Sequence, residues 1–176
     1  MFLRSQNIHF NGLHIDDVAF IDDKTDVEMS NSRVQEDDIL LNITGASIGR
    51  CCVARLSGER ANVNQHVCII RPILSKIIPQ YLSYQLSSPA GQEQIMTVQD
   101  GVSREGLTFD QIANLKLLLP PIEDQQLITR KITEEYMQIN ALVAKVERAV
   151  ELLKEYRIAL ISAAVTGKID LREESA

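Results

Sequence analysis

The spacing of apolar and polar residues divides the chain at the proline pair Pro120-Pro121. Before this pair, short apolar runs alternate with turn residues, which predicts strands interleaved with short helices. Helices are expected over residues 79–86 and 89–98, and after Thr108, which has a capping-box spacing to Gln111. The predicted strands cover residues 18–21, 39–43, 50–56, 66–71 and 115–119. The sequence therefore predicts a mixed, α+β globular domain over residues 1–119.

After the proline pair, the chain is expected to form one long helix. No Gly or Pro occurs between Ile122 and Val165, and Glu123 and Asp124 suit the positive end of a helix dipole. Gly167 is a natural C-terminal stop. A helix of this length extends roughly 66 Å. The prediction is a helix within residues 120–166, followed by a tail over residues 167–176.

One face of this helix repeats apolar residues in alternating steps of four and three. The positions of the repeat are Ile132, Tyr136, Ile139, Val143, Val146, Val150, Leu153, Arg157 and Leu160. All of them except Arg157 are apolar. Such a heptad repeat is typical of a coiled-coil seam. An apolar stripe can also be the core of its own domain, but a preceding domain of this size could not easily cover so long a rod. We therefore favour a helix as the partner of the seam.

Composition excludes several classes of protein. Apolar residues make up 45% of the chain and charged residues 24%, which is typical of a globular protein. The net charge of −6 argues against a wholly basic nucleic-acid wrapper. No apolar run approaches the roughly 20 residues that span a bilayer, and no signal peptide is recognisable. Cys51, Cys52 and Cys68 form no disulfide framework, so the expected location is the cytoplasm, with no membrane association.

Charge is nevertheless distributed unevenly. Residues 1–38 carry three basic and nine acidic side chains, whereas residues 39–120 carry seven basic and five acidic ones. The middle of the chain therefore holds the positive charge, led by Arg50, Arg55, Arg60 and Arg71. Such a cluster can bind phosphates, although a solvated surface is the usual alternative.

Motifs for catalysis are missing. Residues 44–49 resemble the glycine-rich turn of short-chain dehydrogenases, but Cys51 stands where a third glycine is expected, and a strand rather than a helix should follow. His9, His14 and His66 have no metal-ligand spacing. The chain is therefore predicted not to be an enzyme and to bind no metal.

Four segments, residues 38–50, 61–67, 118–126 and 164–170, resemble in this order the specificity subunit of Type I restriction–modification enzymes. The resemblance implies a non-catalytic DNA reader. The family's full subunit carries two target recognition domains, each followed by a long helix, and the two helices pair antiparallel. It also implies methylation and restriction subunits as partners. This chain is expected to bind no cofactor itself, and S-adenosylmethionine is expected in the methylation subunit.

One recognition domain and one helix make the chain look like half of such a subunit, and the strands that usually open a family recognition domain are missing. A half-subunit needs a second copy to rebuild the paired helices, which predicts an antiparallel homodimer that reads a bipartite target. Its interface is predicted to consist of the apolar seam residues Ile132, Tyr136, Ile139, Val143, Val146, Val150, Leu153 and Leu160.

Two loops carry the side chains that read base edges and phosphates. Ser103 and Arg104 are the favoured contacts to double-stranded DNA, and Arg50, Asn64, Gln65 and His66 are further candidates. The amides in the loop over residues 62–66 can instead fasten this loop to its own backbone. A different class of function also stays open, namely an assembly protein whose recognition domain no longer binds DNA.

Overall fold

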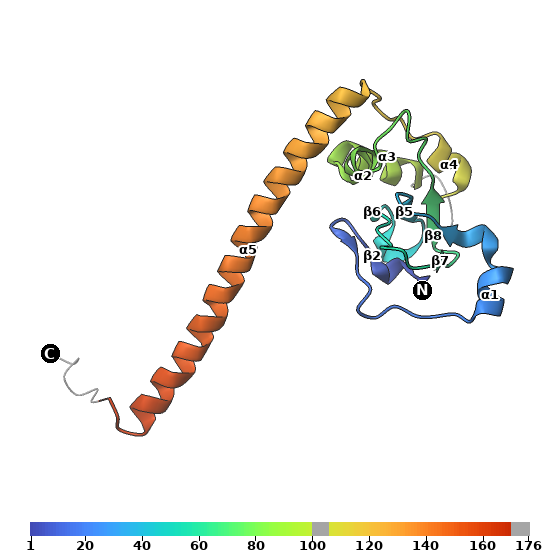
Figure 1. Ribbon diagram of the computed structural model, residues 1–176. Helices are drawn as coiled ribbons and strands as arrows, with labels where there is room; N and C mark the ends of the chain where they lie inside the picture. Colours follow the sequence, from blue (N-terminus) through green and yellow to red (C-terminus); the bar gives the residue numbers. More distant parts are fainter. Residues whose placement is uncertain (100–105, 170–176) are drawn as a thin grey trace. The chain divides into compact units, whose positions relative to one another are not determined.

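The computed structural model describes residues 1–99 and 106–169 (Figure 1). The chain divides into two compact units, Met1–Thr129 and Arg130–Ala176. Within the described ranges, no helix is both long enough and apolar enough to cross a membrane.

Over the described part of the first unit, residues 1–99 and 106–129, short strands form three small sheets. The strands are β1 (Phe2–Leu3), β2 (Ile8–His9), β3 (Gly12–Leu13), β4 (Arg33–Val34), β5 (Ile39–Asn42), β6 (Cys51–Val53), β7 (Ala61–Val63) and β8 (Val67–Ile70). The order β6-β5-β8 makes a central antiparallel sheet, in which Leu41 lies opposite Cys51 and Cys68. In a second sheet, β7 pairs parallel with β1 and antiparallel with β4, and β2-β3 is a hairpin.

Strand β5 is buried along its whole length because both faces of the central sheet are covered. Ile39 and Leu41 point to one core, which they share with residues of helices α2 and α3. Leu40 points to the other core, together with Leu3 and Val63 of the second sheet. This alternation follows from the two-residue period of a strand. It gives the loops at the end of β5 a rigid base.

The helices of the first unit are α1 (Asp23–Glu28), α2 (Pro79–Ser87), α3 (Pro89–Gln99) and α4 (Phe109–Ala113). Helices α2 and α3 contact each other, and α2 also contacts β5 and β6 (Figure 1). Gly91 permits the close approach of α3 to the end of α2, since a Cβ there would lie 2.2 Å from the Gln85 carbonyl oxygen. Thr108 caps α4 in a capping box with Gln111, as the spacing predicted.

Helix α5 runs from Ile122 to Val165, the bounds that the sequence predicted. The predicted α+β fold with a long C-terminal helix is thus confirmed. The assignment of residues 1–119, 120–166 and 167–176 to separate domains stays a prediction.

Two predicted strands are wrong. In residues 18–21 only Ala19 pairs, in an isolated bridge to Phe2, and the acidic residues that follow begin α1, where Asp22 caps the Thr25 N–H. Residues 115–119 belong to no sheet, and Leu118 is 76% exposed. Their backbone is bound by glutamine side chains instead of a neighbouring strand. A run of leucines predicts a buried strand, but Leu115 packs only partly buried against a core, and the backbone of Lys116 and Leu118 is bound by side-chain amides that no periodicity reveals.

Candidate nucleic-acid interface

The loops that follow β5 and precede β8 meet at one end of the central sheet. Thr44 Oγ1 lies 2.7 Å from His66 Nδ1, and the Ile43 N–H donates to the His66 carbonyl oxygen at 2.9 Å. Thr44 also forms a β-bridge with Gly106, and the Leu107 N–H donates to the Ile43 carbonyl oxygen at 2.8 Å. The structure therefore brings three segments distant in the sequence to one place, which we call the loop cluster: residues 43–50, 64–66 and 106–107.

Within the loop cluster, the β7–β8 loop uses one of its amides internally. Asn64 Oδ1 accepts the His66 N–H at 3.1 Å, and the Asn64 N–H donates to the Leu3 carbonyl oxygen at 3.1 Å. Asn64 thus has the fastening role that the sequence left open. Gln65 is exposed, and its Nε2 lies 3.3 Å from His66 Nε2. The amide of Gln65 is the better placed of the two to contact a ligand.

Arg50 lies at the same end of the sheet, at the start of β6. Its N–H donates to the Ser47 carbonyl oxygen at 3.1 Å, and its carbonyl oxygen accepts the Asn42 N–H at 2.8 Å. Gly49 before it has φ +84°, a conformation that favours glycine, so the tight turn depends on this residue. In the part of the chain that the structure describes, Arg50 forms no salt bridge.

The other three arginines between residues 50 and 71 are neutralised by carboxylates of the acidic first segment. Arg71 donates twice to the buried Asp38, with Nε–Oδ1 and Nη2–Oδ2 distances of 2.8 Å, and these hydrogen bonds raise the pKa of Arg71. The remaining pairs are Arg55 with Glu36 and Asp37, and Arg60 with Asp23 and Asp26. Of the four arginines that lead the positive charge of the middle segment, three are therefore paired with carboxylates. Paired guanidinium groups attract phosphate less, because the carboxylates offset their charge.

Ser103 and Arg104, the favoured DNA contacts, lie outside the described residues. The nearest described residue that follows them, Gly106, belongs to the loop cluster.

Beside the loop cluster lies a depression of about 660 Å³ with a mainly apolar lining. Asn64, Gln65 and Phe109, which is 70% exposed, are among the residues that line it. A second depression, of about 560 Å³, contains Arg33 and Arg71. The sequence did not single out Phe109 or Arg33, because only the fold places Phe109 in one depression with Asn64 and Gln65, and Arg33 in the other with Arg71.

In the described ranges, metal ligands are not gathered into a site, and the thiols are held in an unreactive form. No group of three or more His, Cys, Asp or Glu side chains there is arranged to hold a metal ion. All three cysteines are buried, and desolvation raises the pKa of Cys51 and Cys52 to about 12 and that of Cys68 to about 11. These thiols therefore stay protonated at neutral pH, in the form that is a poor nucleophile.

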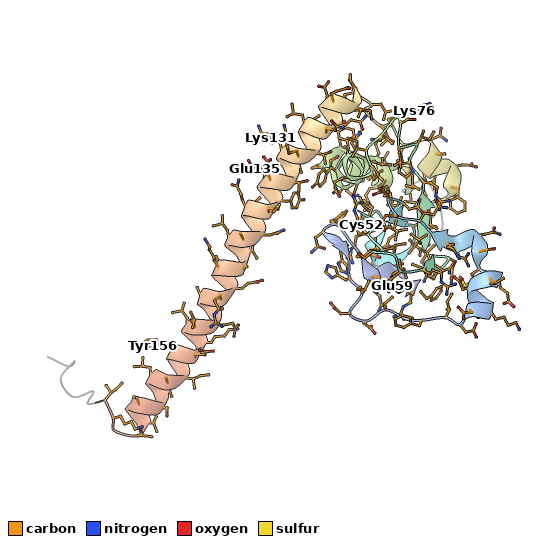
Figure 2. All side chains as sticks on the ribbon, viewed as in Figure 1. Cys52, Glu59, Lys76, Lys131, Glu135 and Tyr156 are labelled. Carbon is orange, nitrogen blue, oxygen red and sulfur yellow. The ribbon has the colours of Figure 1, made fainter. Side chains whose placement is uncertain are left out.

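Along α5, the predicted seam lies open to solvent. Val146 is 62% exposed and Leu153 is 65% exposed, and Leu142 and Tyr156 widen the apolar stripe with exposed fractions of 60% and 65%. Figure 2 shows side chains, Tyr156 among them, projecting outward from the helix. A stripe of this kind marks a surface that another molecule can cover.

The chain belongs to the family of the Type I restriction modification DNA specificity domain, whose model matches residues 20–152. The predicted membership of the specificity-subunit family is therefore confirmed. The match extends from the first unit far into α5.

Three curated relatives are Type I restriction enzyme specificity subunits. The EcoBI subunit of Escherichia coli is 27% identical over 169 residues, which cover 95% of this chain and 35% of the relative. The StySPI subunit of Salmonella potsdam is 22% identical over 171 residues, 95% of this chain and 36% of the relative. The EcoKI subunit of Escherichia coli strain K12 is 21% identical over 172 residues, 95% of this chain and 37% of the relative. The chain thus spans little more than a third of the length of these relatives.

The fold also resembles a solved structure. A chain from a study of complex assembly and conformational transition of the type I R-M system superposes with a TM-score of 0.62 at 15% identity. The superposition covers 91% of this chain and 42% of the other. It supports the fold of the chain.

Proposed function

We propose that this chain is a non-catalytic DNA-recognition module of a Type I restriction–modification complex. The observation that carries the proposal is the match of the DNA specificity domain model over residues 20–152. In this role the chain selects the DNA sequence, and a methylation subunit that binds S-adenosylmethionine performs the methyl transfer. A restriction subunit adds cleavage to the same complex.

The loop cluster is the proposed DNA-reading surface. Amide side chains such as Gln65 can pair with adenine, and arginines with guanine or phosphate. Gln65 is exposed, and Arg50 has no carboxylate partner among the described residues, so both have groups free for DNA. We propose Ser103 and Arg104, which precede Gly106 in the sequence, as further contacts.

The exposed seam of α5 is the proposed dimer interface. Two copies of the chain, paired antiparallel about a two-fold axis near Val146, would present two recognition units to two half-sites. The a positions of the heptad (Tyr136, Val143, Val150 and Arg157) then face the d positions of the partner (Ile132, Ile139, Val146, Leu153 and Leu160), which leaves two registers. One pairs Val143 with the partner's Val146, and the other pairs Val146 with the partner's Val150. In both, Arg157 lies toward the end of the seam, where its charged head can reach water.

DNA binding by the chain together with its methylation subunit tests this function. We expect a sequence-preferring complex whose affinity falls steeply with salt, since phosphate contacts release counterions. Arg104→Ala should weaken binding more than Lys154→Ala, which lies on α5 outside the seam. If the assembled subunits show no preference for any duplex sequence, the chain is instead an assembly protein.

A further inference from the structure

A short extended segment connects α4 to α5, and glutamine amides hold it from the side. Gln85 of α2 binds both backbone groups of Leu118: its Nε2 donates to the carbonyl oxygen at 2.6 Å and its Oε1 accepts the N–H at 2.8 Å. Gln94 of α3 binds Lys116 in the same way, at 3.2 and 2.8 Å. Residues two apart in an extended chain present their backbone groups on the same side. The two amides therefore act as a substitute for a neighbouring strand.

A third glutamine fixes the start of α5. Gln125 is fully buried, and its Oε1 accepts the Ile78 N–H at 2.9 Å. Its Nε2 donates to the carbonyl oxygens of Lys76 at 3.0 Å and Pro120 at 2.9 Å. Both amide protons are thus used, and all the partners are backbone groups of the first unit.

All residues of α5 are described, and among them only Gln125 has a buried side chain. Its neighbour Gln126 is exposed, and Leu127, two residues on, is 55% exposed. A buried amide with three backbone partners is more directional than an apolar contact, because each hydrogen bond requires its own distance and angle. Apolar packing alone would let the first turn of the helix shift, whereas this arrangement specifies one position.

We propose that Gln125 is a positioning residue that sets how many base pairs separate the two half-sites of the DNA target. This inference rests on the proposed function, because the spacing has meaning only if two recognition units are joined through their helices. From Gln125 to the proposed dyad at Val146, α5 rises about 32 Å. A tilt of α5 by about 6° at Gln125 would displace the helix at Val146 by about 3.4 Å, which is the rise of one base pair. A small loosening of this joint is therefore enough to admit a neighbouring spacer length.

Gln125→Leu removes all three hydrogen bonds at similar volume, and Gln126→Leu is the matched control at the exposed neighbour. Gln125→Glu is the milder variant, since it keeps an acceptor for the Ile78 N–H but loses both donations while ionised. If Gln125→Leu fails to fold, Gln125→Glu carries the test.

The first measurement uses the purified chain without DNA. Spin labels attached at Glu59→Cys and Lys145→Cys report the distance from the first unit to α5. The labelled chain is diluted with unlabelled protein, so that only distances within one chain are measured. The native thiols are buried and stay unlabelled. We expect one narrow distance distribution for the wild type and for Gln126→Leu, and a clearly broader or shifted one for the Gln125 variants. Equal distributions for all of them would overturn the proposal.

The second measurement is methylome sequencing of cells that express each variant with the methylation subunit. We expect the wild type and Gln126→Leu to methylate sites with one spacer length. The Gln125 variants should keep the same half-sites and spread at least a tenth of the methylation over spacers one base pair shorter or longer. Reduced methylation at an unchanged spacer would overturn the proposal. If the wild type methylates no specific sequence, the proposed function fails, while the distance measurement still decides the role of Gln125.

Discussion

Val146→Asp should separate the proposed dimer into monomers. Val146 is 62% exposed in the isolated chain, so dimerisation has most of its side chain left to bury. Burying one valine contributes about 1.5–3 kcal/mol, and a two-fold dimer contains two copies, so the loss is about 3–6 kcal/mol. That corresponds to a dissociation constant raised by about 10²–10⁴. Two carboxylates close to the dyad would also repel each other.

Sedimentation equilibrium over a range of concentrations measures this change. Ala141→Asp is the control, because it introduces the same charge five residues away on the face opposite the seam. We expect it to change the dissociation constant less than tenfold. A wild-type chain that is monomeric at micromolar concentration would refute the reasoning, as would equal effects of the two substitutions. Crosslinks that join Ile132 to the partner's Ile132 would exclude the antiparallel arrangement.

Three further outcomes concern the first unit. Asp38→Asn should lower the free energy of unfolding by about 1.5–3 kcal/mol in urea titrations, because Arg71 loses a charged partner. The three buried cysteines should resist Ellman's reagent at pH 8 until the protein is unfolded. Because burial raises their pKa from 9.0 to about 11–12, their contribution to stability is complete below about pH 9 and is lost as the pH rises toward 11–12. Arg50→Ala should reduce the salt dependence of DNA binding by about one released ion, whereas Arg55→Ala should change it less.

Elements with strong local signals could be predicted from the sequence. The bounds of α5 follow from the proline pair before it and the glycine after it, and α4 follows from the Thr108 capping box. Strand β5 was recognisable because burial on both faces gives a continuous apolar run. In each case the residues that determine the element lie within it or directly beside it.

Features that depend on distant contacts could not be predicted. Strands β1 and β4 have two residues each, and their pairing with β7 depends on the tertiary fold. The neutralisation of Arg71 by Asp38 joins residues 33 positions apart, so a count of charges along the sequence overestimated the free positive charge. Likewise, nothing local distinguishes the buried Gln125 from the exposed Gln126. The residue types in the loop cluster suggested DNA contacts from the sequence. The bridge between Thr44 and Gly106, which brings the segments together, could not be predicted.

Sequencing of DNA methylation in cells that carry this chain with its methylation subunit, and no other specificity subunit, tests the proposed function most directly. A two-fold dimer in which each copy carries the same recognition unit should direct methylation to two identical half-sites in inverted orientation. A spacer of fixed length should separate these half-sites. Methylation without sequence preference, or at a target whose two halves differ, would contradict a homodimeric DNA-recognition module.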